Sequence, residues 1–171
     1  MNHGTSITCA NVAVLTVSDT RTIEDDQSGL RIVNSLTDAG HTVTYRKIVR
    51  DDQQAISALV SKWALDQEVD AIIVNGGTGP SPRDVTPDAI LPLLDVVLEG
   101  FGELFRHLSY MEIGAAAMLS RATAGWIETG GTRTPVFLLP GSPAGVTLAL
   151  TQLIVPQLGH LLDVCSLEAS S

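Results

Sequence analysis

The chain has 171 residues, a length that suits one domain with a substantial core, since a chain of this size buries about 70% of the surface it exposes when unfolded. Its 19 acidic and 10 basic residues give a formal net charge of −9. This charge argues against a general nucleic-acid-binding surface and against a surface for anionic membranes, because both need a basic face. An anionic ligand must therefore be bound by backbone N–H groups or side chains at its own site.

The sequence carries no targeting signal that we can identify. Residues 1–6 lack a basic region followed by an apolar one, and no run approaches the roughly 18 apolar residues of a membrane span. The two cysteines, Cys9 and Cys165, have no metal-ligand spacing and are typical of thiols in a reducing compartment. We therefore predict a cytoplasmic protein in which residues 1–171 form one domain that ends in a polar tail at 166–171.

The first predicted strand covers residues 12–17, a nearly continuous apolar run. It ends at Ser18 and Asp19. Ligands of open α/β sheets gather outside the carboxyl ends of the strands, so these two residues are candidates for a binding site. The alternative is turn and capping chemistry, because Ser and Asp also cap helices.

The next elements are a helix over about 26–39, stopped by Gly40, a more exposed strand over 43–49 and a helix over 53–66. Asp51 and Asp52 lie between the last two of these. Either could cap the helix, and local sequence favours capping over catalysis for both.

A glycine-rich loop follows the apolar run at 71–74, which predicts a strand buried on both faces. Gly76, Gly77 and Gly79 allow the backbone to turn its N–H groups inward, and such a loop favours an anion. A plain tight turn is the alternative. The loop matches neither the P-loop nor the dinucleotide fingerprint, so a phosphate would be bound in a different way.

A helix is predicted to start just after this loop, with Thr86 as its N-cap, Pro87 in the first helical position and Asp88 in the first turn, and to continue to residue 94. Asp84 then lies beside a glycine nest and a helix N-terminus. A carboxylate that faces a bound phosphate is repelled unless a divalent cation lies between them. Asp84 is therefore the first metal candidate.

Residues 99–109 predict an amphipathic helix, in which Glu103 and Arg106 lie off the apolar face. The simplest interpretation of these two charges is an exposed ion pair. The apolar face exceeds what one domain needs to cover its sheet, so part of it is predicted to lie between subunits; it consists of Phe101, Leu104, Phe105 and Leu108.

The last third of the chain predicts a small-residue helix over 111–119, a hairpin of strands over 123–128 and 135–139, and a polar turn at 140–143. A final helix over 144–162 is expected to be interrupted at Pro156. Strands that alternate with helices, together with one antiparallel hairpin, predict a three-layer α/β/α sandwich around a mostly parallel mixed sheet.

Several of these stretches together resemble the molybdenum cofactor biosynthesis proteins of the MoaB and MogA type. The resemblance covers about 12–162, and its motifs occur in the family's order. They are Thr16-Val17-Ser18-Asp19, Gly76-Gly77-Thr78-Gly79 with Asp84-Val85-Thr86-Pro87-Asp88, Gly100-Phe101-Gly102-Glu103 with Arg106, Ser120-Arg121-Ala122, and Leu139-Pro140-Gly141-Ser142-Pro143.

The resemblance implies a five-stranded mixed sheet and an activity. Active members of the family transfer AMP from Mg-ATP to the terminal phosphate of molybdopterin, and the two carboxylates important for this match Asp51 and Asp84, which would also hold Mg²⁺. The residues it implies in substrate binding are Ser18, Asp19, Gly76, Gly77, Thr78, Gly79, Thr86, Pro87, Glu103, Arg106, Ser120, Arg121, Pro140, Gly141 and Ser142.

The resemblance also leaves a choice open. The segments at 99–109 and 112–114 are more similar to the MoaB branch, in which some proteins lack adenylylation activity and have a degraded Asp-Val-Thr-Pro motif. That motif is intact here at 84–87, which favours a working adenylyltransferase. A non-catalytic molybdopterin-binding or regulatory protein is the alternative, and family members form trimers or hexamers.

Overall fold

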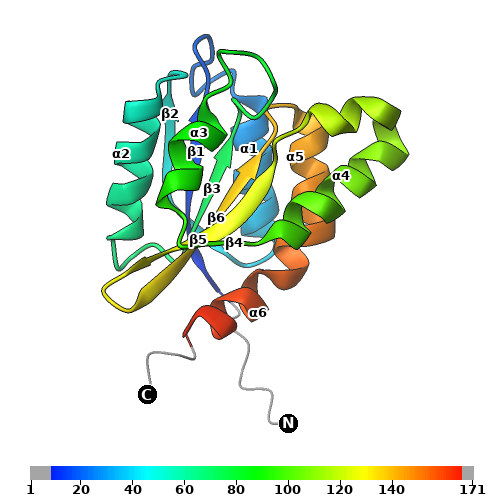
Figure 1. Ribbon diagram of the computed structural model, residues 1–171. Helices are drawn as coiled ribbons and strands as arrows, with labels where there is room; N and C mark the ends of the chain where they lie inside the picture. The colour runs from blue at the N-terminus through cyan, green and yellow to red at the C-terminus, as the bar shows by residue number, and fades with distance from the viewer. Residues whose placement is uncertain (1–8, 167–171) are drawn as a thin grey trace.

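The computed structural model describes residues 9–166 and contains one six-stranded mixed sheet with helices on both faces (Figure 1). The strand order is β2-β1-β3-β6-β5-β4. The first four strands of this order are parallel, while β5 runs antiparallel to both β6 and β4. The predicted sandwich and its mixed sheet are therefore confirmed, whereas the predicted count of five strands is wrong.

The parallel part of the sheet consists of β1 (Asn11–Val17), β2 (Thr42–Val49), β3 (Ala71–Asn75) and β6 (Thr132–Leu139). β1 and β3 lie inside the sheet and are buried on both faces, as their unbroken apolar runs predict. β2 is an edge strand and is more exposed. β5 (Thr123–Thr129) forms the predicted hairpin with β6 through Gly130 and Gly131, which both have positive φ.

The strand that the sequence did not predict is β4 (Val96–Val97), which pairs with Gly125 and Trp126 of β5. Two residues are too few to show the alternation by which a strand is recognised. Only the approach of β5 turns this stretch into a strand, so its assignment depends on tertiary contact.

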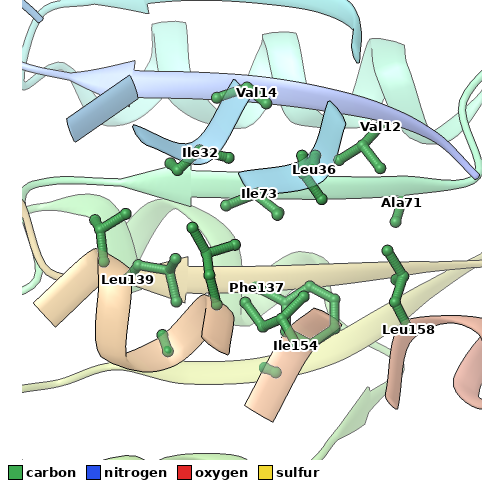
Figure 2. Close-up of a cluster of buried hydrophobic side chains, with 14 of the residues drawn as sticks. Val12, Val14, Ile32, Leu36, Ala71, Ile73, Phe137, Leu139, Ile154 and Leu158 are labelled. Carbon is green, nitrogen blue, oxygen red and sulfur yellow. The ribbon is translucent and has the colours of Figure 1, made fainter. Parts of the chain in front are cut away.

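Side chains that alternate along the strands build two separate cores. One face of the sheet packs against α1 (Gln27–Asp38), α4 (Glu99–Ile113), α5 (Pro143–Ala149) and α6 (Val155–Ser166). Figure 2 shows this core, in which Val14 and Ile73 of adjacent strands lie near Ile32 of α1. The other face packs against α2 (Gln53–Ala64) and α3 (Thr86–Ile90).

The last helical region is continuous over Pro143–Ser166, so the predicted interruption at Pro156 is wrong. A π-helical turn at Leu150–Ile154 joins α5 to α6 and immediately precedes Pro156, which cannot donate a backbone hydrogen bond. By length and composition alone this helix could cross a membrane. Its apolar side, however, packs into the core through Val146, Leu150, Ile154, Leu158 and Leu162, which accounts for its apolar character. Of the tail predicted at 166–171, Ser166 is instead the last residue of α6, and residues 167–171 lie outside the described residues.

Three other local predictions are wrong. Thr86 is not the N-cap of α3, because its hydroxyl instead donates to the carbonyl of Gly76 (2.8 Å), a buried acceptor; Val85 occupies the cap position and Pro87 follows within the first turn. α3 also stops at Ile90, and a 3₁₀ turn at Leu91–Leu93 follows it. The predicted helix over 111–119 is instead the end of α4 followed by a 3₁₀ helix at Gly114–Leu119, because Gly114 has a positive φ.

The apolar face of α4 is mostly internal. Phe105 is buried, and Phe101 and Leu108 pack against the core of this face of the sheet. Only Leu104 remains exposed. The prediction that this set exceeds what the domain needs is therefore wrong for three of its four members, because the core beside α5 and α6 accommodates them.

Candidate active site

A hollow of about 290 Å³ lies outside the carboxyl ends of β1 and β3, at the end of the sheet that is uppermost in Figure 1. Parallel strands end at the same edge of a sheet, which brings residues far apart in sequence together here. The hollow gathers many of the predicted site residues, namely Ser18, Asp19, Asp51, Gly76, Gly77, Asp84 and Gly141.

The glycine loop has the conformation that the sequence predicts. Gly76 and Gly77 have φ values of +99° and +63°, which residues with a Cβ rarely adopt. The N–H groups of Gly77, Thr78 and Gly79 make no hydrogen bond within the described chain, 9–166. These donors are therefore available to the oxygen atoms of an anion.

Asp51 and Asp52, which the sequence left as equivalent candidates for a cap, have different roles. The Asp52 carboxylate accepts from the N–H of Ala55 (2.7 Å) and caps α2. Asp51 instead lines the hollow, where a Cβ on Gly77 would lie 3.0 Å from its Oδ1. The tertiary structure thus separates the residue that caps α2 from the residue that lines the hollow.

The surroundings of Asp51 disfavour the ionised form of its carboxyl group. Burial raises its pKa, the negative charge of Asp84 raises it further, and a backbone hydrogen bond opposes both effects. Within residues 9–166, no three His, Cys, Asp or Glu side chains form a complete metal site. Two carboxylates that face one hollow nevertheless fit Mg²⁺, which is typically bound by one or two carboxylates, water and the phosphates of a substrate.

Arg121 fixes the loop that carries Asp84. Its guanidinium donates to the carbonyls of Gly79 (2.9 Å) and Asp84 and to the carboxylate of Asp88 (3.0 Å). Its backbone N–H also donates to the carbonyl of Thr78 (2.8 Å). The resemblance implies substrate binding by Arg121; in the structure its guanidinium nitrogens are bonded to the loop and to Asp88 of α3, so we assign it to positioning.

Asp19 faces the same loop from the end of β1. Its carboxylate forms an ion pair with Arg83 and accepts from the N–H of Asp51 (3.3 Å). These contacts tie together the three segments that follow β1, β2 and β3. The mutual position of Asp51 and Asp84 therefore depends on Asp19.

A buried polar network beneath the hollow was missed by the sequence analysis. The Asp26 carboxylate accepts from Thr16 (2.7 Å), from the N–H of Gly29 (2.8 Å) and from Arg46 (3.1 Å), while Thr16 also contacts the side-chain oxygen of Asn75 (3.0 Å). This network fixes the residue that precedes the glycine loop. A polar residue at the same place in two apolar strands, Thr16 and Asn75, was the signal that could have revealed it.

Other predicted residues lie outside this hollow. Pro87, Glu103, Arg106 and Arg121 line a separate hollow of about 360 Å³ between α3 and α4. No salt bridge joins Glu103 to Arg106 in the described structure, because Arg106 donates to the carbonyl of Ala122 (2.9 Å) instead. The remaining predicted residues have structural contacts around the two hollows: Thr78 to Leu139, Ser120 to Ala122, Pro140 to Gly145, and Ser142 as the cap of α5.

A larger hollow of about 390 Å³ lies at the opposite end of the sheet, between the end of α2 and the β5–β6 hairpin. None of the predicted site residues lines it. Ligands of open α/β sheets bind at the carboxyl ends of the strands, so the smaller hollow is the candidate active site.

The fold and this hollow define an α/β protein with a candidate anion-binding site outside the carboxyl ends of its parallel strands. Residues 13–160 match the family described as a probable molybdopterin binding domain, and the chain belongs to this family. It is 49% identical over 149 residues to molybdenum cofactor biosynthesis protein B of Bacillus subtilis (strain 168), which covers 86% of this chain and 85% of that protein.

Solved structures agree with this assignment. A crystal structure of a molybdenum cofactor biosynthesis protein B superposes with a TM-score of 0.87 at 44% identity, covering 93% of this chain and 97% of that one. The tungsten cofactor synthesizing protein MoaB from Pyrococcus furiosus has a TM-score of 0.83 at 36% identity, with coverages of 92% and 97%. The resemblance to the MoaB and MogA type is therefore confirmed.

Proposed function

We propose that the chain binds molybdopterin and transfers AMP from Mg-ATP to the terminal phosphate of the pterin. The observation that carries this proposal is the presence of two carboxylates, Asp51 and Asp84, beside the unpaired N–H groups of Gly77–Gly79 in one hollow. A site with both features suits phosphates that are accompanied by a divalent cation. Membership of a family described as a probable molybdopterin binding domain supports the pterin as the second ligand.

Transfer of AMP to the pterin phosphate depends more on positioning the two reacting phosphates than on proton transfer. An oxygen of the pterin phosphate attacks the α-phosphorus of ATP, the bond to the β-phosphate oxygen breaks, and pyrophosphate leaves with the bonding electron pair. The second pKa of a phosphate is near 6, so the attacking group is mostly ionised at neutral pH and no general base is required. The main obstacle is repulsion between two polyanions.

The residues divide this task between them. The N–H groups of Gly77, Thr78 and Gly79 are placed to receive phosphate oxygens, and Arg121 and Asp19 keep the loops in register. Asp51 and Asp84 would hold Mg²⁺. The ion would neutralise phosphate charge and align the two reacting groups.

The test is release of pyrophosphate from Mg-ATP, measured with and without molybdopterin. Release that depends on the pterin supports the adenylyltransferase. Pterin binding without release would instead support a non-catalytic molybdopterin-binding or regulatory protein. Nucleotide binding that is indifferent to the pterin would contradict both.

Removing the charge of Asp51 should stabilise the metal-free protein. Because the pKa of Asp51 is raised in the folded state, its favourable contribution is complete below the unfolded pKa of about 3.9 and is lost as the pH rises through the folded pKa. At pH 7.5 in EDTA, Asp51→Asn should therefore raise the thermal midpoint by about 2 °C, since partly exposed charges are worth at most about 1 kcal/mol. At pH 3.5 the difference should vanish.

With Mg²⁺ present, the wild-type protein should have a higher thermal midpoint than Asp51→Asn. Adding 10 mM Mg²⁺ at pH 7.5 should raise the midpoint of the wild-type protein and leave that of Asp51→Asn nearly unchanged, because a ligand stabilises only the state that binds it. Differential scanning calorimetry of both proteins measures the effect. An equal response of the two proteins to Mg²⁺ would remove Asp51 from the metal site.

We also propose that the protein is a homotrimer or homohexamer. Apolar side chains remain exposed on the second half of α4 and on the 3₁₀ helix after it, and a second subunit would cover them. They include Tyr110, Met111, Ile113, Met118 and Leu119. Light scattering at micromolar concentration should give at least a trimer, and Met111→Lys with Met118→Lys should dissociate it. A monomeric wild-type protein would contradict this proposal.

A further inference from the structure

A hollow of about 580 Å³ adjoins the candidate active site at the edge of the sheet. One wall is residues 18–23, and part of this wall, residues 18–21, also lines the active site. The other wall is the end of β2, residues 46–50. We call this hollow the cationic groove because its lining includes Arg21, Arg46, Lys47 and Arg50.

The charge of this groove is opposite to that of the chain. The whole protein has 10 Lys and Arg residues against 19 Asp and Glu residues. Four of those cations line the groove, where Asp19 is the only acidic lining residue and is itself paired with Arg83. The groove therefore attracts anions locally, although the protein as a whole repels them.

Three of the four cations are available to a ligand. Arg46 is paired with the carboxylate of Asp26 (3.1 Å). Arg21 donates to the backbone carbonyl of Asp25 (3.0 Å), a contact that holds its side chain without neutralising it. Lys47 and Arg50 are exposed, and their side chains form no hydrogen bond or ion pair with any other residue in the range 9–166.

Three backbone N–H groups in one wall of the groove already have acceptors. The N–H groups of Thr20 and Arg21 donate to the Ser18 hydroxyl (3.3 and 3.2 Å), and that of Thr22 donates to Asp25 Oδ1 (2.7 Å). The charged side chains are therefore the main groups that could bind an anion here. In the neighbouring glycine loop, by contrast, backbone N–H groups are available to bind one phosphate at a defined position.

We infer that the cationic groove binds the β- and γ-phosphates of the nucleotide and the pyrophosphate that they become. This inference rests on the proposed adenylyl transfer, in which the bond between the α-phosphorus and the β-phosphate oxygen breaks and the electron pair leaves with pyrophosphate. The leaving group gains charge as it departs, so cations next to the reacting phosphorus stabilise it. Long side chains without fixed partners can follow it as it moves.

Direct binding of magnesium pyrophosphate and of AMP to the full chain tests this inference. Calorimetry at fixed ionic strength would compare the wild-type protein with Lys47→Gln, Arg50→Gln and the double variant. Each single substitution should weaken pyrophosphate binding by about fivefold and the pair by about 25-fold, the scale of exposed charged hydrogen bonds, while AMP binding should change by less than about twofold. Lys62→Gln, an exposed change of equal charge near the end of α2 and outside both hollows, is the matched control.

The outcomes separate this inference from the proposed function. Unchanged pyrophosphate binding in the double variant, or equal losses for AMP and pyrophosphate, would overturn the groove assignment even if the wild-type protein transfers AMP. Failure of the wild-type protein to bind pyrophosphate would also overturn it. If the variants lose pyrophosphate binding but keep AMP binding, and the wild-type protein does not transfer AMP, the groove assignment is upheld and the proposed adenylyltransferase activity is contradicted.

Discussion

Asp84→Asn should lower the rate of adenylyl transfer by at least about a hundredfold while the protein still folds and binds the pterin. The substitution keeps the shape of the side chain, and its amide oxygen can still accept the hydrogen bond that Ser81 N–H donates to Asp84 (2.9 Å). What it removes is the negative charge that faces Asp51 across the hollow. The expected loss is that of one preorganised electrostatic contact.

Asp88→Asn is the matched control for this change. Asp88 lies in the first turn of α3, and its carboxylate is 55% exposed and paired with Arg121. An exposed pair of this kind contributes at most about 1 kcal/mol, so the rate should fall by less than about fivefold. Single-turnover assays under saturating Mg-ATP would compare the two variants. Equal losses at both positions, or full activity in Asp84→Asn, would show that Asp84 has no special role.

Gly76→Ala should cost at least about 3 kcal/mol of unfolding free energy. A residue with a Cβ is strained at the φ of +99°, and this Cβ would collide with the backbone carbonyl of Val17, which cannot rotate away. The loss combines backbone strain with overpacking, each worth about 1–3 kcal/mol. Urea unfolding at one protein concentration, monitored by circular dichroism, would measure it.

Gly130→Ala separates these two causes. Gly130 also has a positive φ (+59°), but a Cβ there would meet no atom within 4 Å. This variant should lose only the strain, about 1 kcal/mol. If both substitutions cost the same, the close approach of Gly76 to β1 would contribute nothing to stability.

Most of the fold could be predicted from the sequence because its main elements are specified locally. Continuous apolar runs identify β1 and β3 as buried strands, and the glycine loop has the positive φ values expected of it. The errors lie where the local structure depends on contact with a segment that is distant in the sequence. β4 exists only because β5 pairs with it, and the Thr86 hydroxyl bonds to Gly76 across a loop rather than capping its own helix.

The candidate site was predicted less completely. The loop and the carboxylates carry local signals, and the family resemblance, not spacing, singled out Asp51. The network around Asp26 and Thr16 is spread over four segments, and no single window of sequence contains it. Arg121 likewise contacts a loop some 40 residues earlier in the chain, as its bond to Gly79 shows.

The sequence by itself determined five of the six strands, the glycine loop and the acidic character of the chain, because each follows from the composition and order of neighbouring residues. The tertiary structure alone decided which carboxylate caps α2 and which faces the hollow, since Asp51 and Asp52 are adjacent and chemically identical. It also decided where the cations gather. Residues 21 and 47–50 form one groove only because parallel pairing of β1 with β2 brings the ends of both strands to the same edge of the sheet.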